Sequence, residues 1–277
     1  MNRRHALHLT VASATSAVLG YGGGLLAQPG QTGPSDGSQP SDVSAASDAD
    51  AKKAQILMLI YPRFTALDLI GPQHVFSLLG PNFKTRLVWK TKDVVMSDTG
   101  VPIRPTQTFA ETTDAPVVLF IPGGTDGTLA AMEDPEVRQF VASRGEKATY
   151  VTSVCTGSLV LAAAGLLKGY QATTHWLALD TLKSFGAEPI AKRVVTDRNR
   201  ITGAGVTAGT DFALTLAAKL KDESYAKGIQ LMMEYDPQPP FDSGRPDVAD
   251  PETVKLLQGM VIQFNRDVEA VGKRLVK

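Results

Sequence analysis

Residues 148–161 have the sequence ATYVTSVCTGSLVL and include Cys155, the single cysteine of the chain. Segment 150–154 is apolar and β-branched, which predicts a short buried strand, and Leu159-Val160-Leu161 predicts a helix that has just begun. Cys155 is therefore expected at a strand-to-helix turn, in the strained and exposed position of a nucleophile elbow. The helix N-terminus there is expected to lower the thiol pKa from about 8.5. A buried structural cysteine is the alternative interpretation.

Similar apolar runs occur on the N-terminal side of this stretch. Residues 55–61 (QILMLIY) and 116–121 (PVVLFI) both precede a proline and are typical of strands covered on both faces. Helical patterns alternate with these strands, which predicts an α/β fold, a three-layer sandwich with a mostly parallel central sheet. Sites in such sheets lie beyond the carboxyl ends of the strands. This rule places residues 61–68, 122–125 and 155–156 at one edge, together with His175.

Shorter signals complete the expected order of elements. Turn residues predict hairpins through Ser97–Gly100 and through Asp197–Asn199. One helical pattern follows Gly124 to about Arg144, and a short strand is expected at Ala172–Thr174. Two helices are expected at 208–221 and 223–235, and a Pro-rich segment then precedes a single last amphipathic helix.

The N-terminal part of the 277-residue chain is not globular in composition. Arg3 and Arg4 precede a weakly apolar run, which predicts a twin-arginine-type export signal at 1–27, with an uncleaved anchor as the alternative. Residues 28–53 are rich in Gly, Pro, Ser and Asp and predict a disordered linker. Residues 54–277 form the expected globular domain. A periplasmic or secreted location follows, with no stable membrane association after signal cleavage.

The charged residues balance, with 28 basic and 28 acidic side chains. No basic stripe points to nucleic acid as a partner. One cysteine excludes an intramolecular disulfide. Two of the four histidines, His5 and His8, fall in the signal, and no spacing of Cys, His and carboxylates suits zinc, so no metal site is predicted.

Several residues at the predicted sheet edge can take part in chemistry. Asp68, flanked by apolar residues, is either a helix cap or a proton donor and acceptor beside Cys155. Gly123 and Gly124 either polarise a developing negative charge through their N–H groups or form an ordinary tight turn. Thr156 either orients substrate or satisfies its own helix end. His175 is either a general base or a structural histidine.

Three motifs in this order carry a family resemblance: LDLIGP at 67–72, IPGGT at 121–125 and VTSVCTGS at 151–158. The chain resembles the ThiJ/PfpI superfamily, which has the class I glutamine amidotransferase-like (flavodoxin-like) fold, and within it the isocyanide hydratase-like branch. The likeness covers residues 55 to about 246. Threonine directly after the cysteine favours this branch over the peptidase-like one.

The resemblance implies roles for individual residues. Cys155 matches the nucleophile, Asp68 the general acid and base, and Thr156 a substrate-positioning hydroxyl. Gly123 and Gly124 match backbone donors near the sulfur. Val206 matches an apolar residue on a helix that lines the site, where Ile is more common in the family. No organic cofactor is implied, and the family forms homodimers with the site near the interface.

An export signal departs from the family, whose hydratases are usually cytoplasmic. Related sensor domains of transcriptional regulators carry a DNA-binding module after this region, whereas 31 residues follow Pro246 here. The leading hypothesis is a cysteine-dependent hydratase that converts isocyanides to N-substituted formamides. The alternatives are an enzyme that detoxifies glyoxals or other reactive carbonyls, and a non-enzymatic periplasmic protein that senses a ligand or the redox state through Cys155.

Overall fold

The computed structural model describes residues 53–276. The expected export signal at 1–27 and all of the expected linker except Lys53 lie outside the described residues. No helix in the described part is long and apolar enough to cross a membrane.

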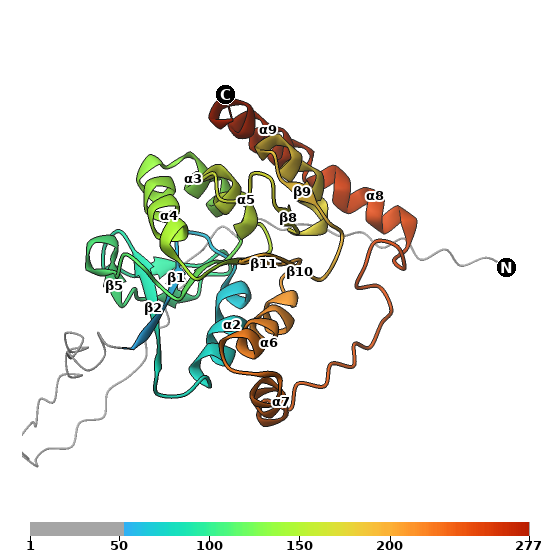
Figure 1. The fold of residues 1–277 in the computed structure, drawn as a ribbon. Coiled ribbons are helices and arrows are strands. Elements are labelled where there is room, and N and C mark those ends of the chain that lie inside the picture. Colours follow the sequence, from blue (N-terminus) through green and yellow to red (C-terminus); the bar gives the residue numbers. More distant parts are fainter. Residues whose placement is uncertain (1–52, 277) are drawn as a thin grey trace, which may run out of the picture. The chain divides into compact units, whose positions relative to one another are not determined.

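A seven-stranded sheet forms the centre of the fold, in the order β10-β11-β7-β6-β1-β2-β5 (Figure 1). Neighbouring strands are parallel except for β10 and β11, which form the predicted antiparallel hairpin. The expected mostly parallel α/β sandwich is therefore confirmed. The strands are β1 (Ala54–Leu59), β2 (Phe83–Trp89), β5 (Gln107–Thr108), β6 (Val118–Ile121), β7 (Tyr150–Val154), β10 (Val194–Asp197) and β11 (Arg200–Gly203).

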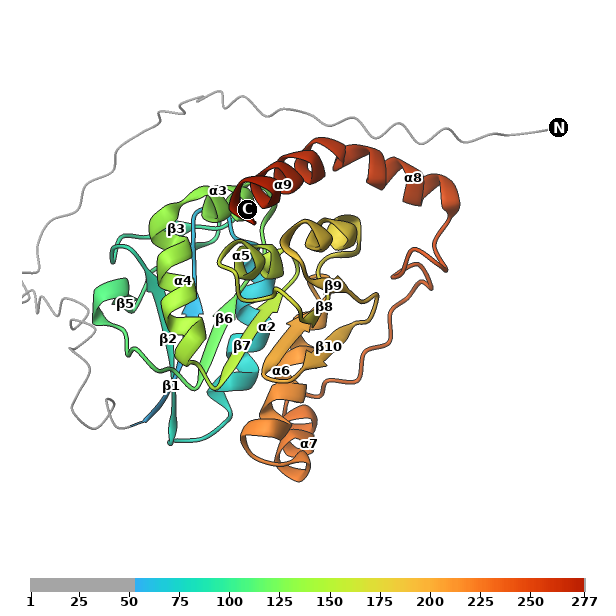
Figure 2. The ribbon, with the colours of Figure 1, turned by 45° about the horizontal axis from the view of Figure 1, so that its top comes forward.

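Helices cover both faces of the sheet, which explains why β6 is buried along its whole length (Figure 2). One layer holds α2 (Ala66–Ser77) and α6 (Ala208–Leu220), which pack on each other, with α7 (Glu223–Met232) beside α6. The other layer holds α3 (Thr125–Glu133), α4 (Pro135–Lys147) and α5 (Gly157–Ala163). The 3₁₀ helix η2 (Trp176–Phe185) and α9 (Ile262–Leu275) pack together beside α5.

Two expected single helices are each divided. The pattern that follows Gly124 forms α3 and α4, because Asp134 caps the second helix by accepting the N–H groups of Glu136 and Val137, and Pro135 cannot continue the first. The last amphipathic segment forms α8 (Pro251–Met260) and α9, which are separated at Val261. The helical pattern expected after Gly124 is confirmed and forms two helices, whereas the expectation of a single last helix was wrong.

The remaining short elements lie outside the central sheet. β3 (Val95–Met96) and β4 (Pro102–Ile103) form the predicted hairpin, and η1 (Phe109–Glu111) is a single 3₁₀ turn. β8 (Gln171–Ala172) pairs with β9 (Glu188–Pro189) in a separate two-stranded sheet. The short strand expected at 172–174 therefore begins and ends one or two residues earlier.

Strand register brings distant residues to one edge. Ile121 of β6 pairs with Ser153 of β7, and Val154 pairs with Gly203 of β11. The residues that follow these strands, including Pro122 and Cys155, therefore leave the sheet side by side. This is the edge at which the sequence predicts a site.

Candidate functional site

Cys155 lies between β7 and α5, at the predicted strand-to-helix turn. Its φ of 55° is in the left-handed region, which is uncommon for a residue with a side chain. Its N–H donates to the carbonyls of Gly203 (3.2 Å) and Ala204 (2.7 Å), and its carbonyl accepts the hydroxyl of Thr174 at 2.9 Å. These bonds hold the strained turn. The cysteine is only 7% exposed, so the expectation of an exposed side chain was wrong.

Asp68 lies in the first turn of α2 and is fully buried. Its Oδ2 atom accepts the N–H of Gly123 at 2.9 Å, and its Oδ1 atom has no hydrogen-bond partner among the described residues. Thr65 occupies the N-cap position of α2, without a side-chain hydrogen bond to the first turn. Asp68 therefore does not act as a helix cap, and its carboxyl faces the turn that carries Cys155.

The thiol and the carboxyl change each other's proton affinity. Burial raises the pKa of Asp68 from 3.8 to about 7. Burial and then the nearby Asp68 charge raise the pKa of Cys155 well above its usual range. The expected lowering of the thiol pKa was wrong, because burial and the Asp68 charge outweigh the hydrogen bonds from Thr156 that lower it. Near neutral pH the sulfur keeps its proton, and Asp68 exchanges one readily.

Gly123 and Gly124 bring the turn after β6 against the Cys155 turn. A Cβ atom on Gly123 would lie 2.8 Å from the Cβ of Cys155 and 2.8 Å from Oδ2 of Asp68, so only glycine fits. The Gly123 N–H donates to Asp68, and the Gly124 N–H donates to Oγ1 of Thr156 at 3.0 Å. In the resting site both N–H groups thus position side chains instead of facing substrate.

A chain of buried hydroxyls supports Thr156. Its Oγ1 atom lies 2.8 Å from Oγ1 of Thr128. Thr128 lies 3.1 Å from the hydroxyl of Tyr61, which donates to the carbonyl of Pro122 at 2.6 Å. This chain fixes the orientation of the Thr156 hydroxyl beside the cysteine.

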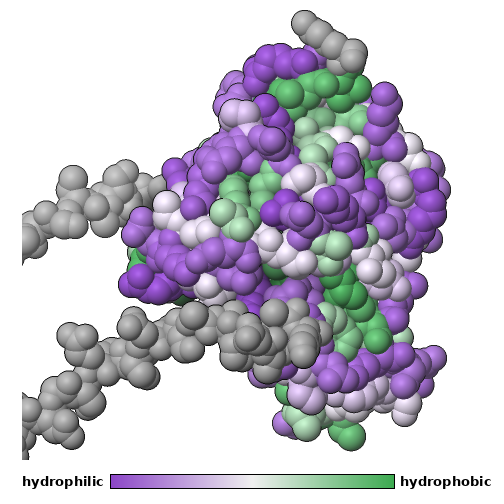
Figure 3. Space-filling view, turned by 60° about the vertical axis from the view of Figure 1, so that its left-hand side comes forward, coloured by the Kyte–Doolittle hydropathy of each residue, from purple (hydrophilic) through white to green (hydrophobic). Residues whose placement is uncertain are grey.

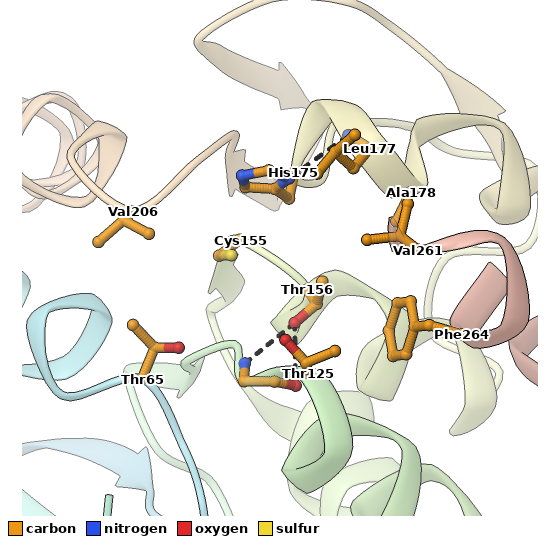
Figure 4. A pocket seen from close by; sticks show the side chains of 11 residues that line it. Thr65, Thr125, Cys155, Thr156, His175, Leu177, Ala178, Val206, Val261 and Phe264 are labelled. Carbon is orange, nitrogen blue, oxygen red and sulfur yellow. Dashed lines mark hydrogen bonds between the residues drawn. The ribbon is translucent and has the colours of Figure 1, made fainter. Parts of the chain in front are cut away.

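A pocket of about 170 Å³ opens next to the sulfur (Figure 4). Its described lining combines hydroxyl groups near Cys155 with apolar side chains farther out, and none of the lining residues is acidic, lysine or arginine. The lining residues are Thr65, Gly124, Thr125, Cys155, Thr156, His175, Leu177, Ala178, Val206, Val261 and Phe264.

His175 faces the pocket from the start of η2 (Figure 4). Its Nδ1 atom accepts the N–H of Leu177 at 3.4 Å, so the ring caps η2. Burial lowers its pKa, which keeps the ring neutral near pH 7. The hydrogen bonds found among the described residues do not join His175 to Cys155 or Asp68. The geometry therefore favours the structural interpretation of His175.

Val206 also lines the pocket, but it precedes α6 instead of lying on a helix. The expectation of a helical position was wrong, because α6 begins at Ala208 after Thr207. The Val206 turn follows Gly203 and Ala204, whose carbonyls accept the Cys155 N–H. A movement of this turn would therefore change the hydrogen bonds that hold the backbone of Cys155.

The described residues contain no group of three or more His, Cys, Asp or Glu side chains placed to hold a metal ion. The chemistry that the site offers is a protonated nucleophile beside a carboxyl with a pKa near neutrality.

Residues 54–219 match the model of the DJ-1/PfpI family. The chain belongs to this family. It is 51% identical to the isonitrile hydratase of Pseudomonas putida over 197 residues, which cover 70% of this chain and 84% of that protein. A crystal structure of a THiJ/PfpI family protein from Pseudomonas syringae matches with a TM-score of 0.78 and 51% identity, covering 79% of this chain and 90% of that one.

The chain is also similar to part of a transcriptional regulator. The HTH-type transcriptional regulator CdhR of Pseudomonas aeruginosa is 33% identical over 123 residues, which cover 44% of this chain and 34% of that protein. The likeness to regulators noted from the sequence thus involves only a part of their length.

Within this DJ-1/PfpI site, the sequence did not indicate the roles of Thr128, Val261 and Phe264. Tyr61 was expected at the correct edge of the sheet, but the sequence did not indicate its hydrogen-bond partners. A threonine in the first turn of a helix has no distinctive pattern, and Phe264 lies in an ordinary amphipathic helix more than 100 positions beyond Cys155. Only the fold brings these side chains to the pocket.

Proposed function

We propose that this chain is a cysteine-dependent isocyanide hydratase, a hydro-lyase that adds water to R–N≡C and yields the formamide R–NH–CHO. The observation that carries the proposal is the pairing of Cys155 with Asp68 across Gly123, at the end of a pocket without charged lining. The 51% identity to the isonitrile hydratase of Pseudomonas putida supports the same activity.

In the first half of the proposed reaction, the sulfur attacks the terminal carbon of the isocyanide. The thiol proton passes to the Asp68 carboxylate as the S–C bond forms, which leaves an electron pair on that carbon. Asp68 then returns the proton to the carbon, giving the thioimidate R–N=CH–S–Cys155. A carboxyl with a pKa of about 7 suits both transfers, because at neutral pH it is present in both its protonated and its ionised form.

Water completes the second half. Its oxygen adds to the thioimidate carbon, Asp68 takes one water proton and passes it to the nitrogen. The C–S bond then breaks as the hydroxyl gives its remaining proton to Asp68 and becomes the formyl carbonyl, and Asp68 passes that proton to the sulfur. The sum of both halves is the addition of one water molecule, with no oxidant or reductant consumed.

A redox-sensing role for Cys155 is less well supported. Sensor cysteines are accessible and carry thiolate character, whereas this cysteine is 7% exposed and its pKa is raised. The carbonyl-detoxifying alternative uses the same pair of groups and is distinguished by its product.

The test is formamide production from phenyl isocyanide by the purified protein, with lactate production from methylglyoxal measured in parallel. Cys155→Ala is expected to abolish formamide production, while a thermal unfolding curve confirms that the variant is folded. Lactate without formamide, or full activity in Cys155→Ala, would contradict the proposal.

We also propose that the chain is exported and forms a homodimer. Export rests on the sequence of residues 1–27 alone, and N-terminal sequencing of protein from a periplasmic extract tests it. The dimer is supported by exposed apolar side chains on α7, on α8 and on the segment between them, namely Leu231, Met232, Phe241, Leu256 and Met260.

A further inference from the structure

One wall of the pocket comes from the C-terminal part of the chain, beyond the residues 54–219 that match the family model. Val261, at the start of α9, and Phe264, one turn later, line the pocket together with Leu177 and Ala178 of η2. Figure 4 shows the Phe264 ring on the side of Thr156, with the sulfur of Cys155 between this wall and Val206. Every member of this wall is apolar.

The wall is held firmly against the rest of the domain. The side-chain amide of Asn265 donates to the carbonyl of Leu177 at 2.8 Å, which ties α9 to η2 inside the pocket wall. Nearer the end of α9, a Cβ atom on Gly272 would lie 2.7 Å from the Cβ of Ser184 in η2, so α9 and η2 are in close contact. Val268 is fully buried between these two anchor points. Phe264 therefore occupies a fixed position.

The volume and the lining limit what can approach the sulfur. An apolar cavity of about 150 Å³ holds one benzene molecule, and this pocket measures about 170 Å³. The pocket is partly open to solvent, and a charged group bound against its lining would lose part of its hydration without gaining a partner of opposite charge among the described lining residues. An apolar group of about one six-membered ring fits both limits.

We propose that Phe264 and Val261 determine substrate specificity, admitting a neutral apolar substituent of at most about one six-membered ring to Cys155. This inference rests on the proposed function for the identity of the substrate, because the substituent is the R group of R–N≡C. The wall itself is a property of the structure and can be tested without that reaction.

The kinetic test compares kcat/KM for methyl, phenyl and 1-naphthyl isocyanide. Phe264→Ala enlarges the pocket, and we expect the ratio of naphthyl to phenyl turnover to rise at least about tenfold, the size of effect that pocket contacts give. Val261→Phe narrows it, and we expect phenyl turnover to fall at least about tenfold while methyl turnover changes less than about threefold. Ile262→Ala is the matched control, because Ile262 is adjacent, 51% exposed and not part of the lining.

A second readout uses Cys155 as the single thiol of the chain. Intact mass gives its rate of alkylation by iodoacetamide and by N-(1-naphthyl)iodoacetamide, in which the S–C bond forms and iodide leaves. Phe264→Ala is expected to raise the naphthyl rate relative to the iodoacetamide rate at least about tenfold. Phe264→Leu, which keeps an apolar contact, replaces it if the alanine variant does not fold.

The two readouts separate the two proposals. Turnover of isocyanides by the natural chain with unchanged ratios in all folded variants overturns the inference and leaves the proposed function standing. No turnover of any isocyanide, with alkylation ratios that shift as expected, removes the proposed function and supports the wall as the size filter. Unchanged alkylation ratios overturn the wall in either case.

Discussion

At the scale of single residues, Asp68 has the most unusual environment in the site. Its carboxyl is fully buried, accepts one backbone N–H and has one oxygen without a hydrogen-bond partner among the described residues. A buried carboxylate with so few hydrogen-bond donors is poorly compensated for the loss of water. The resulting pKa of about 7 is useful for proton transfer and costs stability whenever the group is ionised.

The cost in stability has a defined pH dependence. The folded-state pKa of about 7 is above the ordinary value of 3.8, so the folded protein holds the proton more tightly than the unfolded chain. The stability that the protonated Asp68 carboxyl contributes to the fold is complete below about pH 4 and is lost as the pH rises through about 7. The full difference between the two pKa values corresponds to about 4 kcal/mol in the free energy of unfolding.

Asp68→Asn cannot ionise and should not show this loss. We expect the free energy of unfolding of the natural chain, relative to the variant, to fall by about 2–3 kcal/mol between pH 5 and pH 8. Urea denaturation of both proteins at the two pH values measures it, and titrating groups that do not interact with Asp68 cancel in the comparison. Parallel pH dependence in the two proteins would show that Asp68 titrates normally.

The same residue should shape the pH–rate profile. Asp68 must be ionised to take the thiol proton, so kcat/KM should rise with pH through about 7 and then level off. Asp68→Asn is expected to lose this limb and at least about 100-fold in kcat/KM. Stopped assays of formamide between pH 5 and pH 9 check both. If kcat/KM of the variant still rose with pH through about 7, the rise would belong to another titrating group.

At the scale of elements, α5 is placed by contact with the strand beside it. A Cβ atom on Gly157, the first residue of α5, would lie 2.2 Å from the carbonyl oxygen of Ile121 in β6. The backbones of β6 and α5 therefore touch, and this contact sets where the Cys155 turn lies relative to the turn of Gly123. The geometry of the candidate site depends on this contact.

Gly157→Ala should push these two elements apart. We expect a loss of about 1–3 kcal/mol in stability, as in other overpacked sites, together with a lower kcat. Gly228→Ala in α7 is the matched control, because a Cβ atom there has nothing within 4 Å, and it should stabilise by about 0.4–1 kcal/mol. Chemical denaturation and formamide assays measure both variants. Equal effects of the two substitutions would contradict the contact.

At the scale of the whole molecule, α8 is the described α-helix that packs least against the rest of the chain. It has no buried residue, and it projects beyond the rest of the domain at the end of a long connection (Figures 1 and 2). A ten-residue helix of this kind is marginal in water on its own. The side on which α4 and β5 lie is mostly hydrophilic, with apolar side chains in separate patches (Figure 3). The apolar stripe of α8, formed by Leu256 and Met260, is therefore a candidate for the proposed dimer contact.

Removing that stripe should weaken the dimer. Leu256 and Met260 lie one turn apart and are 59% and 73% exposed. We expect the double variant Leu256→Gln, Met260→Gln to shift from dimer to monomer at micromolar concentration, measured by light scattering after size-exclusion chromatography. The control changes Val94 and Met96, which are 45% and 47% exposed elsewhere, to glutamine and should leave the mass unchanged. A monomeric natural chain, or a variant as dimeric as the natural chain, would contradict the proposed interface.

The sequence by itself determined the sheet and the place of the cysteine. Apolar runs such as 116–121 and 150–154 identify buried parallel strands because both of their faces must be covered. A change of hydrophobic period at Cys155 identifies the elbow, because strand and helix repeats differ. The helix breaks at Asp134 and Val261 were missed, since a helical pattern continues on both sides of each of them.

The tertiary structure alone decided the electrostatics and the shape of the pocket. The thiol pKa is raised and not lowered because burial and the Asp68 charge outweigh the hydrogen bonds from the adjacent Thr156. Thr128 and Tyr61 reach Thr156 from two other elements, and Phe264 closes the pocket from α9. Local patterns specify which element a residue belongs to, whereas desolvation and contact depend on groups far away in the chain that meet only in the folded state.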